Sequence, residues 1–91
     1  MVPPFFIYTS HMIHIGKLIE KELHHQERSV TWFSKKLCCD RTNIYKIFQK
    51  SSVDTELLLR ISTILHRDFF QYYSHELYSS TNEVPQIATE M

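Results

Sequence analysis

Two adjacent cysteines, Cys38 and Cys39, are the first residues of this sequence that could do chemistry. Paired thiolates that hold zinc are usually separated by two to four residues, and the adjacent histidines His24 and His25 have equally unsuitable spacing. No His, Asp or Asn forms a recognisable catalytic pattern with either thiol. We therefore expect no enzyme activity, metal or cofactor, and two small, largely buried cysteines that fill a turn, one of them directed toward the core.

The segment that follows the cysteines combines cationic, amide and hydroxyl side chains. Residues 41–49 have apolar residues at helical spacing, so a helix would turn the intervening polar residues outward together. Arginine can bind guanine O6 and N7 with two hydrogen bonds, asparagine can bind adenine similarly, and a threonine methyl can contact the thymine methyl. The segment thus predicts base contacts in the DNA major groove. The candidates are Arg41, Thr42, Asn43, Tyr45 and Lys46.

Lysines around this segment predict contacts with DNA phosphates. The candidates are Lys35, Lys36 and Lys50, with Lys46 able to act in the same way. Between Lys17 and Lys50 the chain carries eight basic and four acidic residues, a net charge of +4, whereas residues 51–91 have a net charge of −4. The neutral total therefore hides a basic half that suits an anionic partner. Trp32 is either a lid on the first helix or a stacking surface for sugar-phosphate or a partner chain.

Five helices are predicted to position these residues, with Ser29, Asp40 and Asp54 as N-caps. They span residues 14–25, 30–37, 41–49, 55–65 and 69–77. Because a glycine in a first turn costs stability, we expect close backbone packing at Gly16. The predicted inward residues are Ile15, Leu18, Ile19, Leu23, Phe33, Leu37, Ile44, Ile47, Phe48, Leu58, Ile61 and Leu65.

The pattern predicts one compact all-α domain with short flexible ends. Residues 1–12 form an N-terminal appendage, residues 13–78 the domain and residues 79–91 a loose C-terminal tail. Met12 opens the patterned region and is a candidate for an alternative translation start. One glycine and three prolines among 91 residues argue against a turn-rich all-β fold, and the 43% of hydrophobic residues is enough for a core.

The helices predicted over residues 30–37 and 41–49 are separated by three residues, so they must cross at a large angle. The segment SVTWFSKKLCCDRTNIYKIF, residues 29–48, resembles the helix-turn-helix of the lambda-repressor/Cro-type (XRE-like) DNA-binding family. The matching positions are Phe33, Ser34, Leu37, Ile44 and Ile47. The stretches VDTELLLRISTIL and RDFFQYY resemble the next two helices of that family, so the resemblance covers residues 14–77.

The resemblance implies a compact five-helix lambda-repressor-like fold in which residues 41–49 form the recognition helix. It also implies a phosphate contact at the start of the second helix, where family members often carry glutamine and this chain has Val30. Family members usually have glycine in a left-handed conformation at the turn, where this chain has Cys38. They usually dimerise, so that two recognition helices meet successive major grooves about 34 Å apart.

These features predict a small transcriptional regulator that binds double-stranded DNA sequence-specifically, as a homodimer formed through the fifth helix and the tail. The alternative is a protein-interaction adaptor, such as the antitoxin component of a toxin–antitoxin pair, which the aromatic fifth helix and the acidic tail favour. No run approaches the ~20 apolar residues of a membrane span, and the N-terminus lacks the basic region of a signal peptide. We therefore expect a cytoplasmic protein with no membrane contact.

Overall fold

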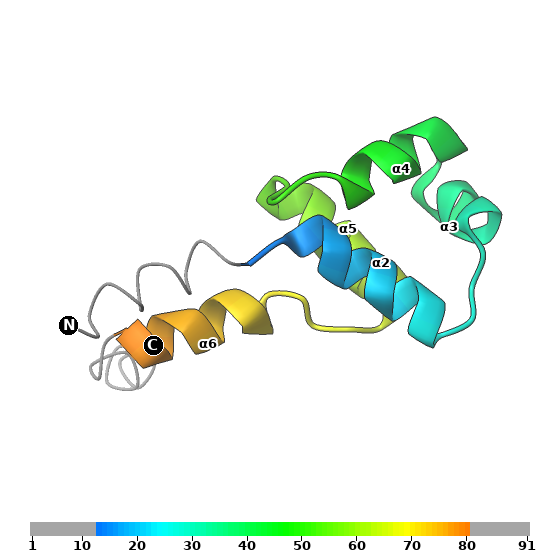
Figure 1. Cartoon of the computed structure of the whole chain (residues 1–91). Coiled ribbons are helices and arrows are strands. Elements are labelled where there is room, and N and C mark those ends of the chain that lie inside the picture. Colours follow the sequence, from blue (N-terminus) through cyan, green and yellow to red (C-terminus); the bar gives the residue numbers. More distant parts are fainter. Residues whose placement is uncertain (1–12, 81–91) are drawn as a thin grey trace. The chain divides into compact units, whose positions relative to one another are not determined.

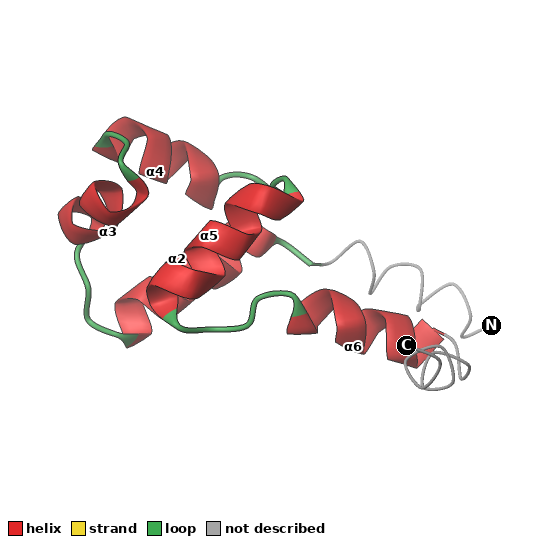
Figure 2. Ribbon diagram, turned by 180° about the vertical axis from the view of Figure 1, so that it is seen from behind, coloured by secondary structure: helices red, strands yellow, loops and turns green. Residues whose placement is uncertain are grey.

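The computed structural model describes residues 13–80, which contain five helices and no strand (Figure 1). The helices are α2 (Ile15–His25), α3 (Val30–Leu37), α4 (Arg41–Phe48), α5 (Thr55–Leu65) and α6 (Gln71–Ser80). The all-α prediction is confirmed, and Figure 2 shows the helices joined by short loops. Within the described residues, no helix is both long and apolar enough to cross a membrane. The predicted appendage of residues 1–12 and the part of the predicted tail from residue 81 onward lie outside the described residues.

The described chain divides into two compact units. His14–Phe69 contains α2 to α5, and residues 70–80, with α6, belong to the other unit. The fifth helix exists, but its predicted start near Phe69 is wrong by two residues. Phe69 is fully buried in the first unit, and its N–H donates to Ser62 Oγ at 3.4 Å. Because packing holds Phe69 outside the helix, α6 begins only at Gln71.

Three helices begin at the predicted N-caps. The Ser29 side chain accepts a hydrogen bond from the Trp32 N–H at 3.0 Å, Asp40 accepts from the Asn43 N–H at 2.9 Å, and Asp54 accepts from the Leu57 N–H at 2.7 Å. Each cap satisfies an amide that has no partner within its own helix. The helices of the helix-turn-helix therefore begin where local chemistry places them.

The core of His14–Phe69 is formed by one face of each of its four helices. Eleven of the twelve predicted inward residues are buried, and Phe69 joins them, whereas Leu18 is only half-buried. The helix α4 packs on both α2 and α3, and α3 also packs on α5. Ser34 is a buried polar residue between these helices, and its hydroxyl donates to the Thr31 carbonyl at 2.8 Å, so its burial leaves no unsatisfied group.

The N-terminus of α2 lies directly on the C-terminal end of α4. The N–H groups of Ile15 and Gly16 donate to the carbonyl oxygens of Ser51 and Lys50, both at 2.9 Å. A Cβ at Gly16 would collide with the Ile47 carbonyl oxygen and would lie 2.5 Å from that of Phe48 and 2.6 Å from that of Lys50. The expected close packing is confirmed, because only glycine leaves room for these carbonyls.

The opposite end of α2 is fastened to the end of α5. Gln26 Nε2 donates to the Leu65 carbonyl oxygen and to Glu22 Oε2, both at 2.7 Å. Glu22 also forms an ion pair with Arg67 at 3.8 Å. The helix α2 is therefore tied at its first turn to α4 and at its last turn to α5.

We expect Gly16→Ala to lower the free energy of unfolding by about 2 kcal/mol or more, because the added methyl must displace backbone carbonyls. Urea unfolding followed by circular dichroism measures the change. The control is Lys17→Ala, which removes an exposed side chain from the same turn and should have little effect. A Gly16→Ala variant as stable as the original chain would contradict the packing described here.

Candidate nucleic-acid interface

The turn between α3 and α4 has left-handed backbone geometry at Cys38, with φ 61° and ψ 45°. The N–H of Cys38 donates to the Lys35 carbonyl at 3.2 Å, and that of Cys39 donates to the Ser34 carbonyl at 3.0 Å. These bonds satisfy the last carbonyls of α3, and Asp40 then starts α4. The left-handed conformation expected at Cys38 is confirmed, although the residue is not glycine.

The two cysteines differ in exposure. Cys38 is exposed and Cys39 is half-buried, so the expectation of two largely buried residues is wrong for Cys38. The exposed cysteine is the one with left-handed backbone geometry, at the end of α3. Burial raises the pKa of the Cys39 thiol, Asp40 raises it further, and Arg60 acts in the opposite direction. Among the described residues, no group of three or more His, Cys, Asp or Glu side chains could hold a metal ion.

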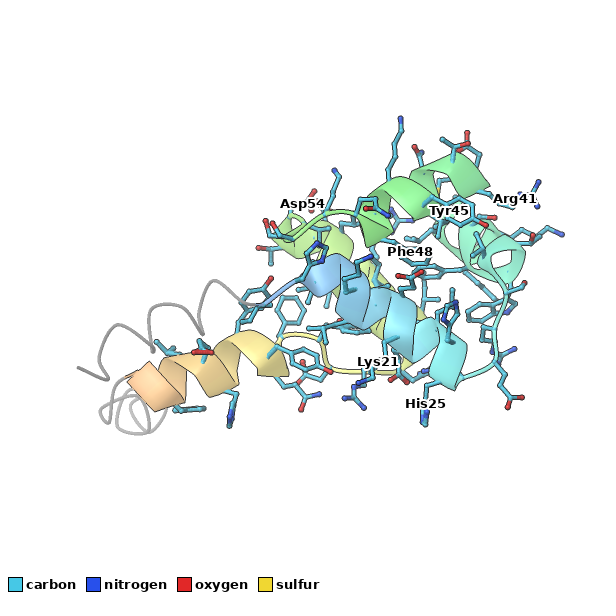
Figure 3. All side chains as sticks on the ribbon, in the orientation of Figure 1. Lys21, His25, Arg41, Tyr45, Phe48 and Asp54 are labelled. Carbon is cyan, nitrogen blue, oxygen red and sulfur yellow. The ribbon has the colours of Figure 1, made fainter. Side chains whose placement is uncertain are left out.

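The five predicted base-contact residues all lie on the exposed side of α4. Its other side is buried through Ile44, Ile47 and Phe48. The exposed residues are Arg41, Thr42, Asn43, Tyr45 and Lys46. Figure 3 shows the Arg41 side chain directed away from the protein at the beginning of α4 and Phe48 on the side that faces α2. One short helix therefore exposes every predicted base contact on the side away from its buried residues.

The Tyr45 side chain is exposed, and its ring packs against a buried aromatic ring. The Tyr45 side chain is 55% exposed. Its ring makes an edge-to-face contact with the ring of the buried Phe48, with the two centroids 6.2 Å apart and the ring planes at 83°. Edge-to-face contacts of this kind stabilise an aromatic pair by about 0.5–1.5 kcal/mol. The Tyr45 hydroxyl is thus carried by a ring whose position is fixed on the helix.

A hollow of about 350 Å³ lies beside this face, between α4, the turn and α5. Its lining residues are Leu37, Cys38, Cys39, Asn43, Lys46, Ile47, Lys50, Leu57 and Arg60. Three of these side chains are cationic and none is acidic. The hollow is therefore a positively charged recess that borders three predicted DNA contacts, Asn43, Lys46 and Lys50.

The other predicted phosphate contacts lie on α3. Lys35 is exposed in the last turn, and Val30 is the first, half-buried residue of the helix. The first N–H groups of a helix have no carbonyl partner within it, so the amide at Val30 suits an anion. Lys36 lines a different hollow from Lys46 and Lys50. The structure therefore does not bring all four predicted lysines together.

Trp32 is half-buried and forms the centre of a cation–aromatic stack. The Arg28 guanidinium carbon lies 4.4 Å from the ring centroid of Trp32, and Lys36 Nζ lies 5.9 Å from it. Such contacts contribute about 0.5–1 kcal/mol at exposed sites. Trp32 thus holds two cations at the surface of α3.

Two cations of this surface were not anticipated from the sequence. Arg28 precedes the N-cap Ser29 and lies outside α3, so helical spacing did not indicate its contact with Trp32. The sequence did not indicate Arg60 either, because it lies in the acidic half of the chain. It reaches the turn only through the packing of α3 on α5. Its Nη2 donates to the Leu37 carbonyl at 3.0 Å.

No protein-family model, curated protein or solved structure gives a significant match to this chain.

We expect Cys38→Gly to raise the free energy of unfolding by about 1 kcal/mol, because glycine adopts the left-handed conformation without the steric cost of a Cβ. Cys38→Val should have the opposite effect, since a β-branched residue tolerates positive φ least. Chemical denaturation under reducing conditions measures both variants. Equal stability of the glycine and valine variants would contradict the left-handed turn.

Proposed function

We propose that this protein is a small transcriptional regulator of the lambda-repressor/Cro-type (XRE-like) helix-turn-helix class that binds double-stranded DNA sequence-specifically. One observation carries the proposal. The helix α4 buries its apolar face and exposes Arg41, Thr42, Asn43, Tyr45 and Lys46 together, directly after a left-handed turn. This arrangement combines groups that can read base edges with a rigid support.

In the proposed complex, α4 enters the major groove. An α-helix with its side chains is about 10–12 Å across, which suits a groove about 12 Å wide. Arg41 and Asn43 lie in the first turn and are the strongest candidates for bidentate contacts with guanine and adenine. Lys35 and Lys50 bind phosphates on either side, and the amide end of α3 at Val30 binds another.

The same proposal includes a homodimer formed through α6 and the tail. Tyr73, Leu77 and Tyr78 are 38%, 51% and 45% exposed on α6, so this helix offers apolar side chains to a partner. A second copy would supply a second α4 for the next major groove.

Selection of bound duplexes from a random pool at two salt concentrations tests the function. We expect an enriched palindrome, and binding that weakens steeply with salt, since each neutralised phosphate contributes about −0.9 to the slope of log K against log salt. Recovery of random sequences at both salt concentrations would contradict sequence-specific binding.

Arg41→Ala should lose about 1–3 kcal/mol of discrimination at one or two base pairs of the selected site, because it removes a bidentate base contact. Titration of matched and mismatched duplexes measures this difference. The control is Lys21→Ala, which removes an exposed cation that points away from α4 (Figure 3). An equal loss of affinity for all sequences would make Arg41 a phosphate contact instead.

A second candidate function is that of an adaptor that binds another protein, such as an antitoxin, and the exposed apolar side chains of α6 favour it. We expect Tyr73→Glu combined with Leu77→Glu to convert a homodimer into a monomer, because two carboxylates cannot be buried in an apolar interface. Sedimentation at high micromolar concentration measures the change. A chain that is monomeric before substitution, and that purifies with a stoichiometric basic partner, would favour the adaptor.

A further inference from the structure

We propose that the hollow between α4, the turn and α5 binds a phosphate group, with Arg60 as its anchor. Resting on the proposed function, this phosphate belongs to the DNA backbone beside the bases that α4 reads. Arg60 thereby becomes a DNA-binding residue contributed by α5, outside the helix-turn-helix segment itself.

The side chains that line the hollow carry positive charge and no negative charge. Lys46, Lys50 and Arg60 line it, and no acidic side chain does. Neither the Lys17–Glu20 nor the Arg67–Glu22 ion pair involves any of these three cations. Clustered cations repel one another and concentrate anions from solution. An anion that binds between them would remove this repulsion.

The nearest capping carboxylates are already engaged with backbone. Asp40 accepts from the Asn43 N–H at 2.9 Å, and Asp54 accepts from the Leu57 N–H at 2.7 Å. Each stabilises the start of its own helix, α4 or α5. Neither is among the residues that line the hollow, so no carboxylate of the lining pairs with the three cations.

The Arg60 side chain is held in place before any ligand binds. One of its terminal nitrogens, Nη2, donates to the carbonyl of Leu37, the last residue of α3, at 3.0 Å. A guanidinium has five N–H donors, so four remain for a ligand. Fixing the planar group in advance reduces the entropy lost when it binds an anion.

The hydrogen-bond donors that line the hollow suit a phosphate group. A guanidinium binds two phosphate oxygens with parallel hydrogen bonds, and ammonium groups add point charges. Asn43 lines the same hollow and contributes an amide donor. The same groups could bind a DNA phosphodiester or a free phosphate monoester, and the experiment must separate these two sources.

The test uses the full chain, a duplex from the selected pool, and the variants Arg60→Gln, Arg60→Lys and Lys21→Gln. We expect Arg60→Gln to weaken duplex binding roughly tenfold and to reduce the salt slope by about one phosphate, equally for all sequences. Arg60→Lys should keep the slope, since it keeps the charge. Lys21→Gln controls for loss of any surface cation. Thermal unfolding of each variant shows whether loss of the bond to Leu37 has unfolded the turn.

A second measurement locates the phosphate on the DNA. Single phosphates of the duplex are replaced by neutral methylphosphonates. At one position the replacement should weaken binding by the original chain, and it should not weaken binding by the Arg60→Gln variant any further. In parallel, inorganic phosphate is titrated while the alkylation rate of the exposed Cys38, which lines the hollow, is followed. Chloride at equal ionic strength is the control.

The outcomes separate the two proposals. Duplex binding that depends on Arg60 and couples to one phosphate supports both. Duplex binding unaffected by Arg60→Gln overturns the phosphate site and leaves the proposed function intact. A third outcome is that the chain binds no duplex, while inorganic phosphate slows the alkylation of Cys38 in the original chain and not in Arg60→Gln. This outcome overturns the proposed function and assigns the hollow to a free phosphate. Absence of both effects overturns the phosphate site as well.

Discussion

The contact between the backbone of Gly16 and the carbonyls at the end of α4 is the constraint on which the rest of the structure depends. Carbonyl oxygens of Ile47, Phe48 and Lys50 occupy the space that a Cβ would need, and the Gly16 N–H bonds the Lys50 carbonyl at 2.9 Å. The first amides of α2 are satisfied by the carbonyls of Lys50 and Ser51, which directly follow α4. The contact fixes both the position of α4 and its rotation about its own axis, and rotation decides which side chains are exposed.

This constraint matters because α4 is short. Eight residues do not form a stable helix alone in water, so its shape comes from the Asp40 cap, the Gly16 contact and the burial of its apolar face. The left-handed Cys38 then sets the direction in which α4 leaves α3. Together these features hold Arg41 and its neighbours outward on a support that does not need to reorganise when a ligand binds. The charged hollow arises from the same arrangement, because Arg60 reaches the turn from α5.

Most of the fold was predictable because its determinants are local. N-caps at Ser29, Asp40 and Asp54, together with apolar periodicity, define four helices to within one residue, and the only glycine marks a close backbone contact between α2 and the end of α4. The errors occurred where tertiary packing competes with local preference. Phe69 is held by the core and not by α6. Cys38 is exposed although it stands in the turn between two packed helices, and the sequence pattern did not indicate this. The exposed face of α4 followed from periodicity, whereas Arg60 did not, since its place depends on how α5 meets the turn.

An NMR titration of the isotope-labelled chain with a duplex tests the central claim most directly, because it reports every backbone amide separately. The account predicts saturable shifts concentrated in residues 29–31 and 40–50 and at the Arg60 side chain, with amides in the middle of α2 unchanged. Shifts distributed evenly over the chain, or confined to α6, would contradict it. So would a spectrum that duplex DNA leaves unaltered at low salt.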